Sequence, residues 1–329
     1  METDWPLEQL RAYRPHLLEP AGLDAFWAET LAPQRARGPH ATYELVDAGL
    51  VAVETHAVEL AGHDDHPVHA WLHLPPAPLR GPGPLPGVVQ YQGYNGGRGL
   101  PHEHVLWALA GYAHLVVDTR GQGSGWSVGA TGDPAGAGAA QPGFLTRGIE
   151  DPRGYYYRRA YADAVAALDV LRAHPLVDPG RVVVAGASQG GALATAVAAL
   201  APGSVAAALV DVPFLADVRR AVAVAQTDPY LELVRYLGAH RDRVETAFAT
   251  LAHVDGAVLA RRATAPALFS VALRDRTCPP STVFAAFHAW AGPAEIEVYP
   301  FNDHEGGGPH HVRRQVAWLR STLGARLEQ

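Results

Sequence analysis

The chain has 329 residues, of which 48% are hydrophobic and 18% are charged, a composition typical of a globular protein with a large core. The net charge of −7 offers no basic surface for a nucleic-acid backbone. All 26 residues counted as lysine or arginine are arginine, which excludes Schiff-base lysines, Ser–Lys dyads and the P-loop lysine. A single cysteine, Cys278, excludes an internal disulfide and a multi-cysteine metal site.

The start of the chain predicts neither a signal peptide nor a membrane anchor. The first four residues include the acidic Glu2 and Asp4, and no apolar segment follows them. No apolar run in the sequence approaches the ~20 residues that a membrane span needs. We therefore expect a cytoplasmic protein with no membrane and no nucleic-acid partner.

The pattern of apolar residues predicts an α/β fold. An amphipathic stretch from Leu23 to Trp27 indicates a helical N-terminal extension over residues 1–45. The alternating segments Val51–Val58 and Val68–Leu74 predict antiparallel strands at a sheet edge. From residue 75 on, short apolar runs alternate with helical patterns, as in βαβ units. We expect a mostly parallel central sheet flanked by helices.

The chain shows no linker that would divide it, so we expect one domain over residues 1–329. Residues 215–262 predict several short helices between two strands, a common position for a cap over an α/β site. The glycine- and alanine-rich stretch Gly129–Gly143 predicts a surface loop or lid.

A candidate nucleophile lies in the segment from Val182 to Leu193. Here Gly-x-Ser-x-Gly stands between a β-branched strand and an apolar helix, which is the context of a nucleophile elbow. Ser188 is then the nucleophile, and the backbone N–H of Gln189 is an oxyanion donor at the start of the helix. A dinucleotide-binding turn is disfavoured because Ser188 stands where that motif needs its second glycine. The alternative interpretation is that this segment is only a structural turn.

An acid and a base follow the serine in the chain order expected for this motif. Asp275 comes where the strand Ala267–Leu273 ends, and His304 lies in a glycine-rich loop after the strand that ends at Tyr299. In this arrangement Asp275 orients His304, which takes the serine proton. Alternatively, Asp275 pairs with a neighbouring arginine and His304 is a solvated loop histidine.

The other polar residues predict no metal or cofactor site. His63, His66 and His69 lie near acids but lack the His-Glu-x-x-His spacing that places two ligands on one helix face. Asp118 ends a strand but precedes the serine, so a structural role is favoured. Cys278 is expected to be a small buried residue, because nothing near it in sequence lowers the pKa of its thiol.

The motifs in this order identify a resemblance to a known family. They are Pro6-Leu7, Tyr13–Pro15, Tyr91–Gly97, Arg120–Gly123, Gly148-Ile149, Tyr155–Arg158, Gly186–Gly191, Pro279–Ala286 and His304-Glu305. Nearly end to end, the chain resembles the acetyl xylan esterase/cephalosporin C deacetylase family, carbohydrate esterase family seven, which has the α/β-hydrolase fold. The combination of Arg-Gly-Gln-Gly, Gly-x-Ser-Gln-Gly-Gly and His-Glu is specific, although each motif alone is weak.

The resemblance implies a catalytic triad of Ser188, Asp275 and His304, with Tyr91 donating its backbone N–H as the second oxyanion contact beside Gln189. It also implies removal of acetyl groups from esterified sugars, xylo-oligosaccharides and cephalosporin C. It further implies that no cofactor is needed and that the protein is a homo-oligomer, commonly a hexamer. Phe214, after the strand that precedes the helical insertion, is expected to line a small acyl pocket or to be a core residue of the cap.

The predicted function is therefore that of a serine esterase for acetate esters of small molecules. Two alternatives remain, an α/β-hydrolase esterase or peptidase with longer-acyl specificity and a non-catalytic binding protein of the same fold. The chain departs from the family where Gln92 replaces a histidine and where Asp303 replaces the glycine before the catalytic histidine. We expect both departures to affect the rate and the pH optimum more than the class of reaction.

Overall fold

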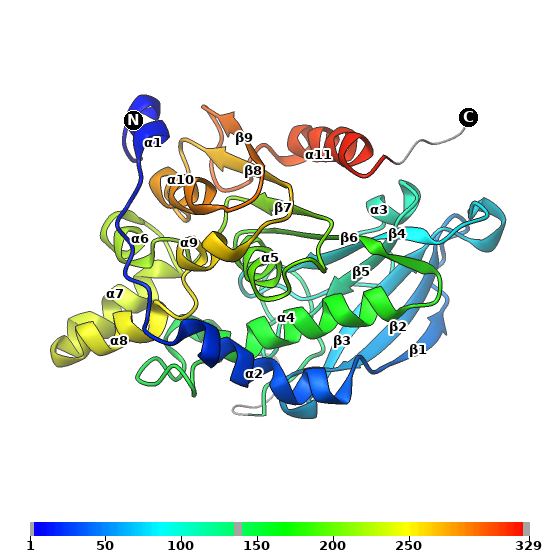
Figure 1. The fold of residues 1–329 in the computed structure, drawn as a ribbon, viewed down its shortest axis with the longest axis horizontal. Coiled ribbons are helices and arrows are strands. Elements are labelled where there is room, and N and C mark those ends of the chain that lie inside the picture. Colours follow the sequence, from blue (N-terminus) through cyan, green and yellow to red (C-terminus); the bar gives the residue numbers. More distant parts are fainter. Residues whose placement is uncertain (1–2, 135–139, 325–329) are drawn as a thin grey trace.

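The computed structural model describes residues 3–134 and 140–324, and within them one twisted sheet runs through the molecule (Figure 1). Its strand order is β1-β2-β3-β5-β4-β6-β7-β8-β9. The strands are β1 (Ala41–Val46), β2 (Glu54–Ala61), β3 (Pro67–Leu74), β4 (Leu85–Tyr91), β5 (Ala113–Val117), β6 (Val177–Ala187), β7 (Ala207–Asp211), β8 (Ala267–Ala272) and β9 (Ala294–Tyr299).

Antiparallel pairing is confined to one edge of the sheet. The pairs β1–β2, β2–β3 and β3–β5 are antiparallel, whereas β5, β4, β6, β7, β8 and β9 pair in parallel. Every residue of β5 and of β8 is buried, as expected for parallel strands covered on both faces. The predicted α/β class with a mostly parallel sheet is confirmed.

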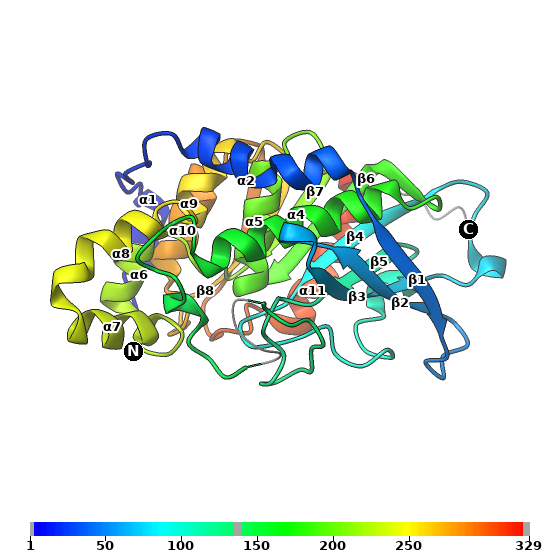
Figure 2. The same ribbon diagram turned by 90° about the horizontal axis from the view of Figure 1, so that it is seen from below.

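Helices cover both faces of the sheet, and a further group gathers at one end. The helices are α1 (Leu7–Ala12), α2 (Leu23–Arg37), α3 (Leu106–Leu109), α4 (Tyr156–Ala173), α5 (Gln189–Leu200), α6 (Val218–Val224), α7 (Tyr230–Ala239), α8 (Val244–Leu251), α9 (Gly256–Leu259), α10 (Pro280–Ala289) and α11 (Gly308–Thr322). Figure 2 shows α2, α4 and α5 on one side of the sheet and α11 on the other. No helix of the described residues is long and apolar enough to cross a membrane.

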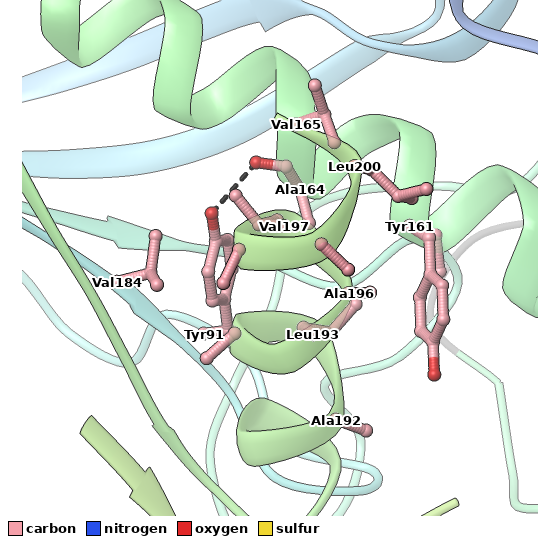
Figure 3. Close-up of a cluster of buried hydrophobic side chains, with 14 of the residues drawn as sticks. Tyr91, Tyr161, Ala164, Val165, Val184, Ala192, Leu193, Ala196, Val197 and Leu200 are labelled. Atoms are coloured by element: carbon pink, nitrogen blue, oxygen red, sulfur yellow. Dashed lines mark hydrogen bonds between the residues drawn. The ribbon is translucent and has the colours of Figure 1, made fainter. Parts of the chain in front are cut away.

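The main core lies between the sheet and the α4–α5 layer. In Figure 3, apolar side chains of α5 such as Leu193 and Val197 pack among residues of α4 and of the central strands. The Tyr91 hydroxyl, at the end of β4, donates a hydrogen bond of 2.8 Å to the carbonyl of Ala164 in α4. The carboxyl end of β4 is thereby attached to the helix layer, next to the start of α5.

The first strands differ from the sequence expectation at their boundaries. The N-terminal helices end at Arg37, and Ala41–Val46 is already a strand paired with β2, although residues 1–45 are predicted as a helical extension. Most of β1 is exposed, with Leu45 at 68%, so an edge strand with little burial gives no apolar alternation in the sequence. Similarly, β2 begins at Glu54 and not at Val51, which is 99% exposed in the preceding loop.

The segment 215–262, predicted as a helical insertion, is helical, and the described part of Gly129–Gly143 is irregular. Between β7 and β8 the chain forms α6, α7, α8 and α9. The helices α6, α7 and α8 lie together at the end of the molecule opposite β1 (Figures 1 and 2), whereas α9 packs against α5 and α10. Of the predicted loop Gly129–Gly143, residues 135–139 lie outside the described residues, and the others form no helix or strand.

Candidate active site

Ser188 lies at the sharp turn between β6 and α5. Its backbone has φ 57° and ψ −119°, a strained conformation for a residue with a side chain. A Cβ on Gly186 would overlap the backbone of Gly190, and a Cβ on Gly190 would overlap the carbonyl of Tyr91. The turn therefore needs both glycines of the motif. Its geometry is that of a nucleophile elbow, with the serine at the N-terminus of the following helix.

Backbone hydrogen bonds hold the elbow to the neighbouring strand. The Ser188 N–H donates to the carbonyl of Asp211 at 2.9 Å, and the Ser188 carbonyl accepts the N–H of Phe214 at 3.0 Å. The serine side chain is thus carried by a turn that is fixed on both sides, as a positioned nucleophile requires.

Asp275 and His304, predicted as acid and base, are in direct contact. Asp275 Oδ2 and His304 Nδ1 are 2.8 Å apart, and Asp275 Oδ1 accepts the backbone N–H groups of Thr277 at 2.8 Å and Cys278 at 2.9 Å. The carboxyl group is buried, with Asp275 1% exposed. A carboxylate at Nδ1 favours the tautomer that leaves Nε2 as the proton acceptor.

Ser188 and His304 line the same cavity, which has a volume of about 720 Å³. The cavity lies at the carboxyl ends of β4, β6 and β7, where ligands bind in open parallel sheets. Trp126 contributes an aromatic wall, and the helical segment after β7 contributes Asp228 and Pro229.

The side chain of Gln189 joins the elbow to two other loops. Its Oε1 accepts from Gln122 Nε2 and from the Tyr157 hydroxyl, each at 2.8 Å. Its Nε2 donates to Gln122 Oε1 at 3.1 Å and to the carbonyl of Gln92 at 3.2 Å. The two carboxamides therefore form a reciprocal pair, and both side chains are 0% exposed. The sequence alone did not identify this role of Gln122, although Gln122 belongs to the Arg-Gly-Gln-Gly motif.

Tyr91, expected to donate a backbone N–H to the oxyanion, lines the cavity at the end of β4. Its ring extends into the core, where the hydroxyl is bonded to Ala164 (Figure 3). Its main chain is therefore the part of Tyr91 that faces the site. Burial raises the pKa of the Tyr91 phenol well above its ordinary value of 10.0, so the phenol is neutral.

Phe214, expected to line an acyl pocket or to be a core residue of the cap, is not among the residues that line the cavity. It is 0% exposed, and its ring centroid lies 4.6 Å from that of Tyr230 and 6.1 Å from that of Tyr94. The backbone of Phe214 is close to the serine through the hydrogen bond to Ser188, but its ring packs with the helical segment. The ring of Phe214 belongs to the main hydrophobic core, and its acyl-pocket role stays a prediction.

Two further residues have the structural roles that the sequence favours. Asp118 accepts the backbone N–H groups of Arg98 at 2.6 Å and Ala130 at 2.8 Å, and so fastens two loops. Cys278 is fully buried, its Sγ lies 4.0 Å from Ser188 Oγ, and burial raises the pKa of its thiol well above 9.0. A thiol in this environment stays protonated and is a poor nucleophile.

In residues 3–134 and 140–324 no group of three His, Cys, Asp or Glu side chains is arranged to hold a metal ion.

The order of the strands, the strained serine after β6, and the Asp–His pair on the loops after β8 and β9 define the α/β-hydrolase class. Over residues 1–322 the chain matches the family described as acetyl xylan esterase. The chain belongs to this family and is a carboxylic ester hydrolase.

Three relatives illustrate the similarity. An acetyl xylan esterase from Paenibacillus sp. is 37% identical, with a TM-score of 0.88 over 96% of this chain and 99% of that one. Acetyl xylan esterase 1 from a Thermoanaerobacterium species is 29% identical, with a TM-score of 0.83 and the same coverage. The acetyl esterase Axe7A of Xylanibacter ruminicola is 26% identical over 322 residues, which are 94% of this chain and 69% of that protein.

Proposed function

We propose that the protein removes acetyl groups from esterified sugars and related small molecules through a triad of Ser188, His304 and Asp275. The observation that carries the proposal is the 2.8 Å contact between Asp275 Oδ2 and His304 Nδ1, on a histidine that shares its cavity with the elbow serine. The names of the three relatives support acetate as the acyl group. Acetylated xylo-oligosaccharides and the acetoxymethyl group of cephalosporin C are the esters to test first.

In the proposed mechanism, Ser188 Oγ attacks the acetyl carbon while His304 Nε2 takes the hydroxyl proton. The backbone N–H groups of Tyr91 and Gln189 stabilise the negative charge that develops on the carbonyl oxygen. The C–O bond to the alcohol then breaks, and the alcohol leaves with the proton from His304. Water, deprotonated by His304, attacks the acetyl-serine, and acetate is released as Ser188 regains its proton.

The test is hydrolysis of p-nitrophenyl acetate, butyrate and octanoate by the wild type and by Ser188→Ala. We expect turnover that falls with chain length and drops at least about 10³-fold in the variant, the scale of loss when a triad nucleophile is removed. Activity that survives Ser188→Ala would place the reaction elsewhere. Activity that rises beyond butyrate would favour a longer-acyl esterase instead.

The homo-oligomer and the cytoplasmic location expected from the sequence stay predictions. We propose the hexamer only on the family resemblance, and light scattering of the purified protein tests it. A monomeric mass at micromolar concentration would contradict it.

A further inference from the structure

Trp126 is 62% exposed, although it lines the cavity that contains Ser188 and His304. Every other tryptophan of the chain is buried or half-buried. Apolar surface in water is costly, and an exposed aromatic side chain at a cavity is typical of a ligand-binding site. An acetyl group has three heavy atoms and fills only a small part of about 720 Å³, so the cavity also has room for the alcohol part of the ester.

We infer that Trp126 is a stacking surface for the sugar ring that carries the acetyl group, and that it makes the enzyme prefer cyclic sugars to open-chain alcohols. This inference rests on the proposed function, because it takes Ser188 as the nucleophile in the same cavity. It adds to that function the place of the leaving group and a residue that determines specificity.

The first argument is that the exposed part of the indole is apolar. Its one polar atom, Nε1, donates a hydrogen bond of 2.9 Å to the carbonyl of Tyr94. The six-membered ring lies against the main chain of Gly96, where a Cβ would overlap it. Because the N–H group already has a partner, it gains nothing from exposure. The accessible part of Trp126 is therefore ring surface, which the apolar face of a ligand can cover.

The second argument is that the tryptophan is held in place before a ligand binds. The segment that carries it is bonded to the loop after β4 on either side of the ring. The Gly125 N–H donates to the carbonyl of Asn95 at 3.1 Å, and the carbonyl of Ser127 accepts the N–H of Gly97, also at 3.1 Å. An aromatic side chain that is already fixed loses little conformational entropy when a ligand stacks on it, which favours binding.

The third argument is the chemistry of the leaving group. A pyranose ring presents C–H groups on its face and hydroxyl groups around its edge. The C–H groups are slightly positive and are attracted to the negative face of an aromatic ring. An open-chain alditol has the same kinds of group but no fixed apolar face, so contact with the indole takes water from its hydroxyl groups. Stacking on Trp126 should therefore favour the cyclic sugar.

The experiment compares kcat/KM for a monoacetylated methyl xyloside with kcat/KM for monoacetylated xylitol, its open-chain counterpart. In Trp126→Leu we expect the xyloside-to-xylitol ratio to fall about fivefold, the scale of one aromatic contact, through a higher KM for the xyloside. Trp126→Phe should keep most of the wild-type ratio, because it retains an aromatic face although it lacks the indole N–H. The ratio cancels any common effect of a substitution on the triad.

Tyr43→Leu is the matched control, because Tyr43 is an aromatic residue of β1 that is 40% exposed but does not line the cavity. Its xyloside-to-xylitol ratio should equal that of the wild type. A wild-type ratio in folded Trp126→Leu would overturn the inference. An equal fall in Trp126→Phe and Trp126→Leu would also overturn it, because the lost hydrogen bond to Tyr94 and not the aromatic face would then be the cause.

Binding is also measured without turnover, in Ser188→Ala. Titration with the acetylated methyl xyloside should change the tryptophan fluorescence of Ser188→Ala and leave that of Ser188→Ala/Trp126→Leu unchanged. The same change in both proteins would contradict stacking on Trp126. Failure of the proposed function has a different signature, because p-nitrophenyl acetate would then not be hydrolysed by the wild type, or its hydrolysis would survive Ser188→Ala.

Discussion

At the scale of single residues, Gln122 connects the loop that follows β4 to the start of α5, next to the two proposed oxyanion donors. Its Oε1 accepts the backbone N–H of Asn95 at 2.6 Å, in the loop after β4, while its carboxamide is paired with Gln189 at the start of α5. Its Nε2 also donates to the Tyr156 hydroxyl at 2.9 Å. All the donors and acceptors of this carboxamide are used, so its position is fixed.

Gln122→Met should therefore lower kcat for p-nitrophenyl acetate about tenfold or more, because less well aligned donors stabilise the oxyanion less. KM should change by less than about threefold, because Gln122 does not line the cavity and acts as a positioning residue. Steady-state kinetics gives both constants, and Gln34→Met is the control for loss of a buried glutamine. A folded Gln122→Met enzyme with unchanged kcat would refute this role.

The sequence predicts residues of the site only where a local pattern marks them. Ser188 stands in a five-residue motif, and Asp275 and His304 follow strands, so their places at strand ends can be read from neighbouring residues. The pairing of Gln122 with Gln189 joins positions 67 residues apart and forms only when the sheet is assembled. The ring of Phe214 likewise packs against Tyr230, a contact that no local pattern in the sequence marks.

At the scale of elements, the turn from β6 to α5 depends on close approach between backbones. Gly190 lies against the carbonyl of Tyr91, so that the first turn of α5 touches the end of β4. This contact brings the two proposed oxyanion donors, on β4 and α5, beside one another.

Gly190→Ala should lower the free energy of unfolding by about 1–3 kcal/mol, the usual cost of overpacking. It should also lower kcat, because the added methyl group separates β4 from α5. Urea unfolding and ester hydrolysis measure the two effects. Gly81→Ala is the matched control, since a Cβ there meets no atom within 4 Å, and equal behaviour of the two variants would disprove the argument.

Strands whose residues are buried can be predicted from the sequence, whereas an exposed strand at the edge of the sheet is harder to predict. The wholly buried strands β5 and β8 are mostly apolar, interrupted only by His114 and Ser270, and the sequence pattern marks Ala267–Leu273, which contains β8, as a strand. The strand β1 has four exposed residues in a row, so its place in the sheet comes from pairing with β2 and not from its own pattern. Propensity and periodicity carry no signal for a strand that is held mainly by its neighbour's backbone.

At the scale of the whole molecule, buried histidines make stability depend on pH. Burial lowers the pKa of His73 to about 4, from 6.5 in an unfolded chain, and His73 is 0% exposed. Between these two pKa values the unfolded chain binds more protons than the folded one. The free energy of unfolding therefore falls as the pH falls through this window, by about 1.4 kcal/mol per pH unit from this group.

His73→Gln should consequently make the loss of stability between pH 6.5 and pH 5 smaller by about 2 kcal/mol. Urea unfolding at several pH values measures the slope, and the same variant above pH 7.5, where His73 is neutral in both states, is the internal control. A variant with the wild-type slope below pH 6.5 would show that His73 is protonated in the folded protein.

The position of Cys278 allows its thiol to report on opening of the structure around Ser188. It is the sole thiol of the chain, it is fully buried, and its sulfur lies 4.0 Å from Ser188 Oγ. A thiol-specific reagent can reach it only when the surrounding packing opens. The labelling rate of the native enzyme therefore measures how often the region around the serine opens, and a ligand that closes the cavity should slow that rate in proportion to its occupancy. Mass spectrometry can follow this reaction without any engineered cysteine.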